Sequence, residues 1–271
     1  MDMMSILFPA VVLGGLGVLF GGLLGVASKK FAVEVDEQVS TLRSYLPGAN
    51  CSGCGYPSCD AFADAVIHKG VDPSGCMVIS AENLQLAGAA IGREVAAKAT
   101  KEACVTCQGT CENSPPRFQY EGIESCKSAA LVAGGSKGCK YACLGCGDCV
   151  AACGFGAIKL GEGGIPVVDF DKCTGCGACS RACPRDVIKM IPTDAGVVVR
   201  CHTKAPDYFG AQFCRYGCVS CGKCEEICPS GAITVEDGVA KIKYEHCVGC
   251  GWCMDACPMG VITPFESYKM N

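Results

Sequence analysis

The sequence has few of the large side chains from which a protein core is normally built. Its 271 residues include one tryptophan, eight tyrosines and ten phenylalanines. Burial of apolar area alone therefore gives such a chain little stability, and disulfides, metals or clusters must help to order it. The sequence also lacks a Lys/Arg-rich tract and its net charge is only −4, which argues against nucleic acid as a partner. No G-x-G-x-x-G loop follows a strand and no Walker loop is present, so we expect no nucleotide on this chain.

Cysteine is abundant instead, with 27 residues, and glycine contributes another 36. Many of the cysteines lie too close together in the sequence to pair with one another without strain, and an odd total fits a closed set of disulfides poorly. We therefore interpret the cysteines as thiolate ligands of metal in a reducing compartment.

Four segments after residue 139 repeat one template, C-x2-C-x2-C-x3-C. Proline follows the last cysteine in three of them and Gly154 in the first, and a short apolar tail comes next each time. The segments form two tandem pairs. Their cysteines are Cys143, Cys146, Cys149 and Cys153; Cys173, Cys176, Cys179 and Cys183; Cys218, Cys221, Cys224 and Cys228; and Cys247, Cys250, Cys253 and Cys257.

This spacing favours [4Fe–4S] clusters over zinc, because zinc sites usually show two C-x2-C pairs separated by a dozen or more residues. Residues 139–265 resemble two-cluster bacterial ferredoxins, in which the cysteine before proline ligates the other cluster of the pair. The resemblance implies crossed ligand sets. These are Cys143, Cys146, Cys149 with Cys183; Cys173, Cys176, Cys179 with Cys153; Cys218, Cys221, Cys224 with Cys257; and Cys247, Cys250, Cys253 with Cys228.

Two further cysteine groups precede the repeats. The first is Cys51, Cys54, Cys59 and Cys76, and the second, looser group is Cys104, Cys107, Cys111 and Cys126. On spacing alone the first group could also be a four-cysteine zinc knuckle. Its surrounding residues, NCSGCGYPSCDAFADAV, resemble the four-iron domain that follows the membrane anchor in the B subunit of Rnf-type ion-translocating oxidoreductases. Members of that family can have a single ferredoxin pair, so the second pair and the second group depart from the shorter pattern.

Three cysteines remain, Cys139, Cys201 and Cys214, so all-cysteine ligation allows up to six clusters. Cys139 and Cys214 occupy matching positions, CKYAC and CRYGC, four residues before a repeat. These two could replace an assigned ligand, Cys146 before any other, and Cys201 is a further possible alternate; all three could instead be buried thiols without a metal.

Residues 6–27 form an uncharged run of 22 residues, long enough for a helix to span a hydrocarbon core of about 30 Å. A cleaved signal peptide is the alternative, but no basic residue precedes the run. Lys29 and Lys30 follow it, which places the rest of the chain in the cytoplasm. Small residues at Gly17, Gly21 and Gly25 favour a partner helix.

The expected fold class is α+β: an N-terminal transmembrane helix, a small helical four-iron domain and two tandem ferredoxin-like βαββαβ modules. Periodicity and composition predict helices within 29–48, over 60–69 and over 81–103. The expected domains are an anchor (1–28), a four-iron domain (29–98), a connecting segment (99–133), module 1 (134–193), a linker (194–208) and module 2 (209–271).

The cysteine pattern predicts electron transfer through several clusters. The Rnf resemblance implies a subunit of a redox-driven ion translocase in the bacterial cytoplasmic membrane. Such a subunit would accept electrons from soluble reduced ferredoxin and relay them to membrane subunits, with NAD as the final acceptor and Na⁺ or H⁺ as the coupling ion. The alternatives are an electron-transfer subunit of another membrane enzyme, of the hydrogenase or formate dehydrogenase type, and a zinc-stapled interaction protein.

Overall fold

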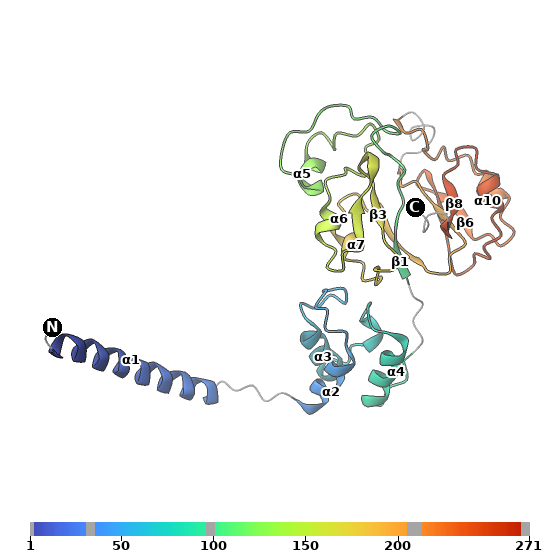
Figure 1. Ribbon diagram of the computed structural model, residues 1–271. Helices are drawn as coiled ribbons and strands as arrows, with labels where there is room; N and C mark the ends of the chain where they lie inside the picture. The colour runs from blue at the N-terminus through green and yellow to red at the C-terminus, as the bar shows by residue number, and fades with distance from the viewer. Residues whose placement is uncertain (1–2, 31–35, 96–100, 205–212, 267–271) are drawn as a thin grey trace.

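The computed structural model describes residues 3–30, 36–95, 101–204 and 213–266. Figure 1 shows three parts along the chain: a long N-terminal helix, a small group of helices drawn in blue to teal, and a larger part of strands and short helices drawn in green to red.

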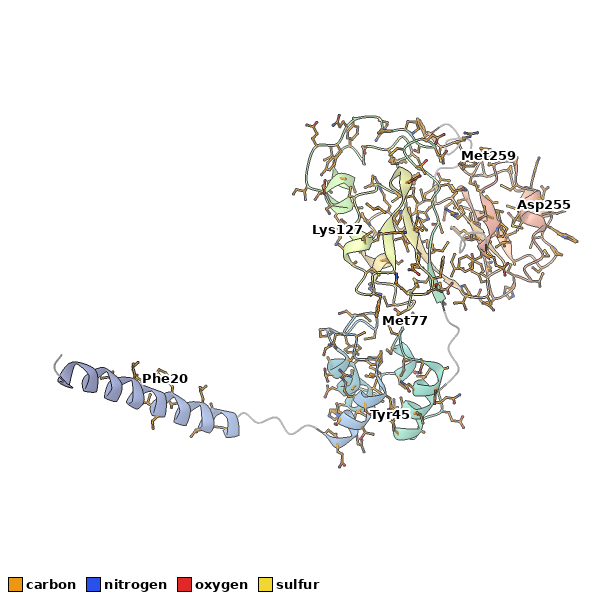
Figure 2. All side chains as sticks on the ribbon, in the orientation of Figure 1. Phe20, Tyr45, Met77, Lys127, Asp255 and Met259 are labelled. Carbon is orange, nitrogen blue, oxygen red and sulfur yellow. The ribbon has the colours of Figure 1, made fainter. Side chains whose placement is uncertain are left out.

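The long helix is α1 (Met3–Lys30). Its side chains are described over residues 12–27, and most of the apolar ones are exposed, Leu13 and Val18 among them. Figure 2 shows Phe20 projecting from α1 into open space. Among the described residues, no helix is long and apolar enough to cross a membrane. The membrane span expected over residues 6–27 stays a prediction.

The small helical part contains α2 (Glu37–Tyr45), α3 (Cys59–His68), the 3₁₀ turn η1 (Pro73–Gly75) and α4 (Ala81–Ala90). At the start of each α-helix a side-chain oxygen accepts a backbone N–H from the first turn; the acceptors belong to Asp36 for α2, Ser58 for α3 and Ser80 for α4. The predicted helices within 29–48 and over 60–69 thus correspond to α2 and α3. Their apolar faces meet in a core that includes Leu42, Phe62, Val66 and Cys76.

The helix expected over residues 81–103 is wrong at its C-terminal end. Helix α4 stops at Ala90, and Gly92 follows with a φ of +67°. Residues 96–100 lie outside the described part, and Lys101–Val105 form strand β1. This strand pairs antiparallel with β4 (Ile188–Pro192), and Ala103, Cys104 and Val105 are fully buried there. Tertiary pairing overrides the helical propensity of this segment.

Beyond that segment, the chain repeats one order of elements. The first copy is β1, α6 (Asp148–Ala151), β2 (Ile158–Leu160), β3 (Pro166–Val168), α7 (Ala178–Ala182) and β4. The second is β5 (Val197–Val199), α9 (Lys223–Glu226), β6 (Ile233–Glu236), β7 (Val239–Ile242), α10 (Trp252–Asp255) and β8 (Ile262–Pro264). In both copies the first strand pairs with the last and the two middle strands pair with each other, all antiparallel.

The first copy contains two further elements. Helix α5 (Cys126–Leu131) lies between β1 and α6, and the 3₁₀ turn η2 (Glu162–Gly164) lies between β2 and β3. The first strands, β1 and β5, come from the segments expected to be a connection (99–133) and a linker (194–208). Figure 1 shows the two copies next to each other, with β1 on the side of the small helical part.

In each cysteine repeat, a glycine directly precedes the short helix that contains the third cysteine. Gly147, Gly177, Gly222 and Gly251 precede α6, α7, α9 and α10, and each has a left-handed backbone with φ between +71° and +84°. Glycine adopts this conformation without the steric cost that a Cβ atom imposes. The glycine between the second and third cysteines of every repeat is therefore a backbone requirement for the tight loop.

Candidate iron–sulfur centres

The first cysteine group comes together in the small helical part. Cys51 and Cys54 lie in the loop before α3, Cys59 is the first residue of α3 and Cys76 follows η1. The side chain of Asn50 accepts the backbone N–H of Cys59 at 2.8 Å and so closes the loop. Burial raises the pKa of Cys76, N–H bonds from Val78 and Ile79 oppose the shift, and the thiols of Cys54 and Cys59 add to it. The sulfurs of Cys54, Cys59 and Cys76 are therefore close enough to interact electrostatically.

In the second module, one complete crossed set lines a single cavity. Cys218, Cys221 and Cys224 come from the loop before α9 and the turn into it, and Cys257 comes from the end of the other repeat. The cavity has about 330 Å³ of space not filled by protein atoms, some of it open to solvent. Burial, then the neighbouring thiols of Cys218 and Cys257, raise the pKa of Cys224 to about 11. Four thiol donors around one cavity, otherwise lined mainly by apolar side chains, fit the needs of a [4Fe–4S] cluster.

The other set of the second module gathers around Cys253. Burial and the charges of Cys247, Cys228 and Cys250 raise its pKa to about 11, although a backbone N–H opposes the shift. These neighbours are the three partners that the ferredoxin resemblance implies. Cys250 is exposed, so this centre reaches the protein surface.

The first module holds a similar pair of centres. Cys143, Cys149 and Cys183 line one cavity of about 330 Å³. Burial, then the neighbouring Cys173 and Cys176, raise the pKa of Cys179 to about 12. Cys153, the implied fourth partner of these three cysteines, accepts the N–H of Ala157 at 3.3 Å.

Cys126 is an addition that the repeats did not predict. It is the first residue of α5, and it lines the cavity with Cys143, Cys149 and Cys183, whereas Cys146 is not among the lining residues. Burial, then the charge of Cys126 and a hydrogen bond with it, raise the pKa of Cys146 to about 11. The carboxylate of Asp148 fixes Cys126 by accepting its backbone N–H at 3.0 Å. Cys126 and Cys146 therefore lie together where the repeat predicts a single thiol.

The second cysteine group is dispersed. Cys104 is buried in strand β1 against Ile191 and Phe265, and Cys126 lies at the cavity just described. Cys111 is exposed and accepts a hydrogen bond from Lys137 at 3.5 Å. Cys107 lies in another cavity, which it lines together with the three cysteines left over from the repeats, Cys139, Cys201 and Cys214. Cys139 is therefore not the thiol beside Cys146. Among the described residues, no group of His, Cys, Asp or Glu side chains is arranged to hold a single metal ion.

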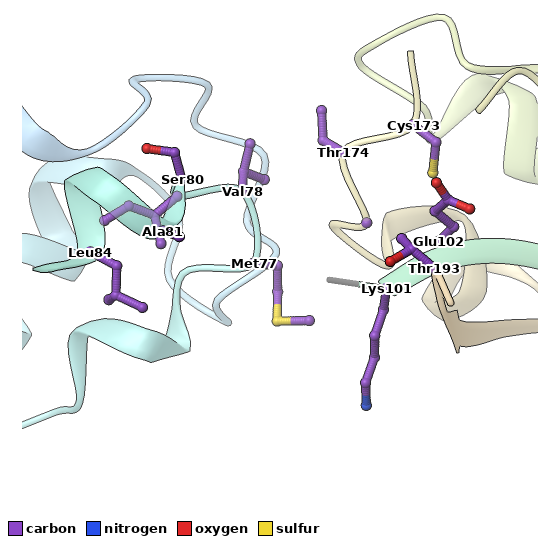
Figure 3. A pocket seen from close by; sticks show the side chains of 12 residues that line it. Met77, Val78, Ser80, Ala81, Leu84, Lys101, Glu102, Cys173, Thr174 and Thr193 are labelled. Carbon is purple, nitrogen blue, oxygen red and sulfur yellow. The ribbon is translucent and has the colours of Figure 1, made fainter. Parts of the chain in front are cut away.

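The small helical part and the first module meet at their cysteine loops. A Cβ atom on Gly53 would lie 3.0 Å from the carbonyl oxygen of Cys176 and 3.3 Å from Sγ of Cys51, so only glycine permits this approach without a shift. Figure 3 shows the adjoining pocket, in which Met77 and Val78 face Cys173 and Thr174 across the gap. The cysteine loop of the helical part therefore lies next to the loop of Cys173 and Cys176 in the first module.

Comparison with known proteins supports the presence of iron–sulfur clusters in this chain. Residues 46–78 match a family model described as a putative Fe-S cluster, and residues 142–188 and 217–261 match a 4Fe-4S dicluster domain. The chain is similar to the B subunit of the Na⁺-translocating ferredoxin:NAD⁺ oxidoreductase complex of Acetobacterium woodii, at 42% identity over 89% of this chain and 72% of the relative.

With two other relatives, the match extends over a larger share of the relative's length. The B subunit of the ion-translocating oxidoreductase complex of Methanosarcina acetivorans is 40% identical over 90% of this chain and 92% of the relative. The B subunit of the proton-translocating ferredoxin:NAD⁺ oxidoreductase complex of Clostridium ljungdahlii is 40% identical over 89% of this chain and 85% of the relative.

Proposed function

Because the chain belongs to the family of B subunits of ion-translocating oxidoreductase complexes, we propose that it carries electrons along a row of [4Fe–4S] clusters within such a complex. The observation that carries this proposal is the cavity of the second module. Three cysteines of one repeat and the last cysteine of the next line it together, as ligation in two-cluster ferredoxins requires.

Five clusters follow from the cysteine groups described so far. One is bound by Cys51, Cys54, Cys59 and Cys76, and the remaining four are bound by the crossed sets of the two modules. In the first module, either Cys126 or Cys146 binds the iron atom that was expected to be bound by Cys146 alone. A bound cluster supplies one-electron redox chemistry. The protein supplies the thiolates, backbone N–H bonds to sulfur and apolar walls that limit the access of water.

The order of the centres in space suggests the path of the electrons. The loop of Cys51 contacts the loop of Cys176 at Gly53, and Cys149 is close enough to Cys179 to affect its pKa. The path would therefore run from the helical part through both centres of the first module toward the second. We propose that the working units are residues 36–95, 101–193 and 197–266, with the first strand of each module included.

Two of the relatives are named as subunits of a ferredoxin:NAD⁺ oxidoreductase complex. We propose the same role here: soluble reduced ferredoxin donates electrons, and other subunits of the complex accept them and reduce NAD⁺. The chain is then a subunit of a redox enzyme with no substrate-converting site of its own. One relative is named for Na⁺ and another for protons, so the coupling ion is not a property of the family as a whole.

We also propose that α1 anchors the chain in the bacterial cytoplasmic membrane, with all clusters on the cytoplasmic side. The apolar side chains of residues 12–26, exposed in the chain by itself, support this proposal, because large apolar surfaces are rarely left in water. Lys29 and Lys30 at the end of the helix favour this orientation.

Metal analysis of anaerobically purified protein, combined with EPR of the reduced form, tests the proposed function. Five clusters require about 20 iron per chain, and a sixth raises this to about 24. The absence of iron, with zinc in its place, would contradict electron transfer and favour a zinc-stapled protein.

A further inference from the structure

One cavity at the junction of the two modules is lined by cysteines that belong to none of the five sets. Cys107, Cys139, Cys201 and Cys214 all line it. Its space not filled by protein atoms, about 340 Å³ with some open solvent included, is close to the about 330 Å³ of the cavity formed by Cys218, Cys221, Cys224 and Cys257. The two cavities therefore resemble each other in size and in their four thiols.

The four cysteines are related by the internal repeat. Cys107 lies two residues after strand β1, and Cys201 lies two residues after the equivalent strand β5. Cys139 and Cys214 each lie four residues before the first cysteine of their module. Each module thus contributes the same two positions. Such matched contributions are not expected of unrelated buried thiols.

Backbone N–H groups point at three of these sulfurs, those of Cys107, Cys201 and Cys214. The N–H of Gly109 donates to Sγ of Cys107 at 3.3 Å. The N–H groups two residues after Cys201 and Cys214 also donate to those sulfurs, and the N–H of Gly145 does the same for Cys143. Hydrogen bonds of this kind stabilise thiolate ligands and tune cluster potentials.

A buried cation lies beside the cavity. Lys137 is only 4% exposed, and its ammonium donates to the carbonyl oxygen of Gly109 at 2.9 Å. The ion pairs found among the described residues do not include Lys137. A buried ammonium without a carboxylate is costly unless other negative charge is near. Four thiolates around a cluster would supply that charge, and Lys137 already lowers the pKa of Cys214 against the larger effect of burial.

The cavity is hydrogen-bonded to a centre on either side. The N–H of Cys143, a ligand in the first module, donates to Sγ of Cys107 at 3.5 Å. The N–H of Cys218, a ligand in the second module, donates to Sγ of Cys201 at 3.3 Å. One peptide N–H thus separates each of these sulfurs from a ligand of a neighbouring cluster.

We propose that Cys107, Cys139, Cys201 and Cys214 ligate an additional [4Fe–4S] cluster that connects the two ferredoxin-like modules. This inference rests on the proposed function, because it extends the same row of centres. The site takes one electron from the cluster of one module and passes one electron to the cluster of the other, so no bond is made or broken and no proton is required. It brings the total to six clusters and leaves Cys104, Cys111 and one thiol of the Cys126–Cys146 pair over.

The test compares the full-length chain with two variants and a control after anaerobic loading with iron and sulfide. The double variant Cys201→Ala/Cys214→Ala removes the contribution of one module. The control, Cys104→Ala, removes a cysteine of strand β1 that is outside all six sets. We expect about 24 iron in the wild type and the control, and about 20 in the double variant.

A milder variant guards against misfolding. Cys139→Ala leaves three thiolates at the site, so we expect about 23 iron and the EPR signal of one three-iron centre, with the other clusters unchanged. Equal iron in the wild type and the double variant would overturn the inference, as would the loss of one zinc without any loss of iron. About 20 iron in the wild type would leave the proposed function standing and overturn the sixth cluster alone. An iron-free wild type would contradict both.

Discussion

Crossed ligation in the second module makes a prediction that iron counting alone can check. Cys257 lines a cavity with Cys218, Cys221 and Cys224, although in the sequence it ends the repeat that contains Cys250. Cys221 and Cys250 are both exposed, so replacing either by alanine removes a thiol and leaves no buried cavity behind. The two residues are therefore matched test positions, one in each cluster.

The double variants separate the two connectivities. If Cys257 shares a cluster with Cys221, the variant Cys257→Ala/Cys221→Ala leaves two thiolates on one cube, which should be lost entirely, at about four iron per chain. The variant Cys257→Ala/Cys250→Ala leaves three thiolates on each of two cubes. Each cube should then lose its one unligated iron, for a total loss of about two, and become a three-iron centre.

Iron and sulfide analysis with EPR of the oxidised protein reads out both variants. We expect two three-iron centres in the Cys257→Ala/Cys250→Ala protein and none in the Cys257→Ala/Cys221→Ala protein. The single variants provide the reference, because each should lose about one iron. The reverse pattern, with the larger loss from the pair Cys257 and Cys250, would mean that each repeat ligates its own cube, and the reasoning would fail.

Three further predictions follow from the same geometry. Cys126→Ala and Cys146→Ala should each retain a full iron content, because either thiol can take the shared corner, whereas the double variant should lose about one iron; loss from Cys146→Ala alone would exclude Cys126 as a ligand. Gly53→Ala should separate the loops of the helical part and the first module by a few tenths of an ångström. The magnetic interaction between their reduced clusters should then weaken at constant iron content, while Gly154→Ala, where an added Cβ meets nothing within 4 Å, should leave EPR line widths unchanged. Deleting residues 1–28 should give a soluble brown protein with the iron content of the full chain, and its recovery only as a colourless aggregate would argue against an independent cluster domain.

The repeats allowed most of the module architecture to be predicted, because the cysteine spacing reflects local loop geometry. Each loop needs a left-handed glycine before its helix, and the sequence has one at the same position in every copy. The membership of the B-subunit family was predicted correctly from the same motifs. Strand β1 was missed, because its strand conformation depends on pairing with β4, which is distant in the sequence.

The cavity at the junction was missed for a related reason. Cys107 was grouped with its sequence neighbours, whereas the structure places it with Cys139, Cys201 and Cys214. Spacing says little when ligands come from separate loops that tertiary packing brings together. The matching segments CKYAC and CRYGC were a usable signal, since they showed that the repeat extends beyond the ferredoxin motifs. The positions of Cys107 and Cys201 after equivalent strands became visible only when β1 was seen to pair with β4 and β5 with β8.

The central claim is that one chain holds a continuous row of one-electron centres. Coulometric reduction of the anaerobically purified full-length protein, followed by EPR at each step, measures it most directly. We predict an uptake of about six electrons per chain, one for each cluster, with magnetic coupling between neighbouring centres as the row fills. A protein that takes up no electrons, or fewer than about five with iron fully loaded, would contradict the account.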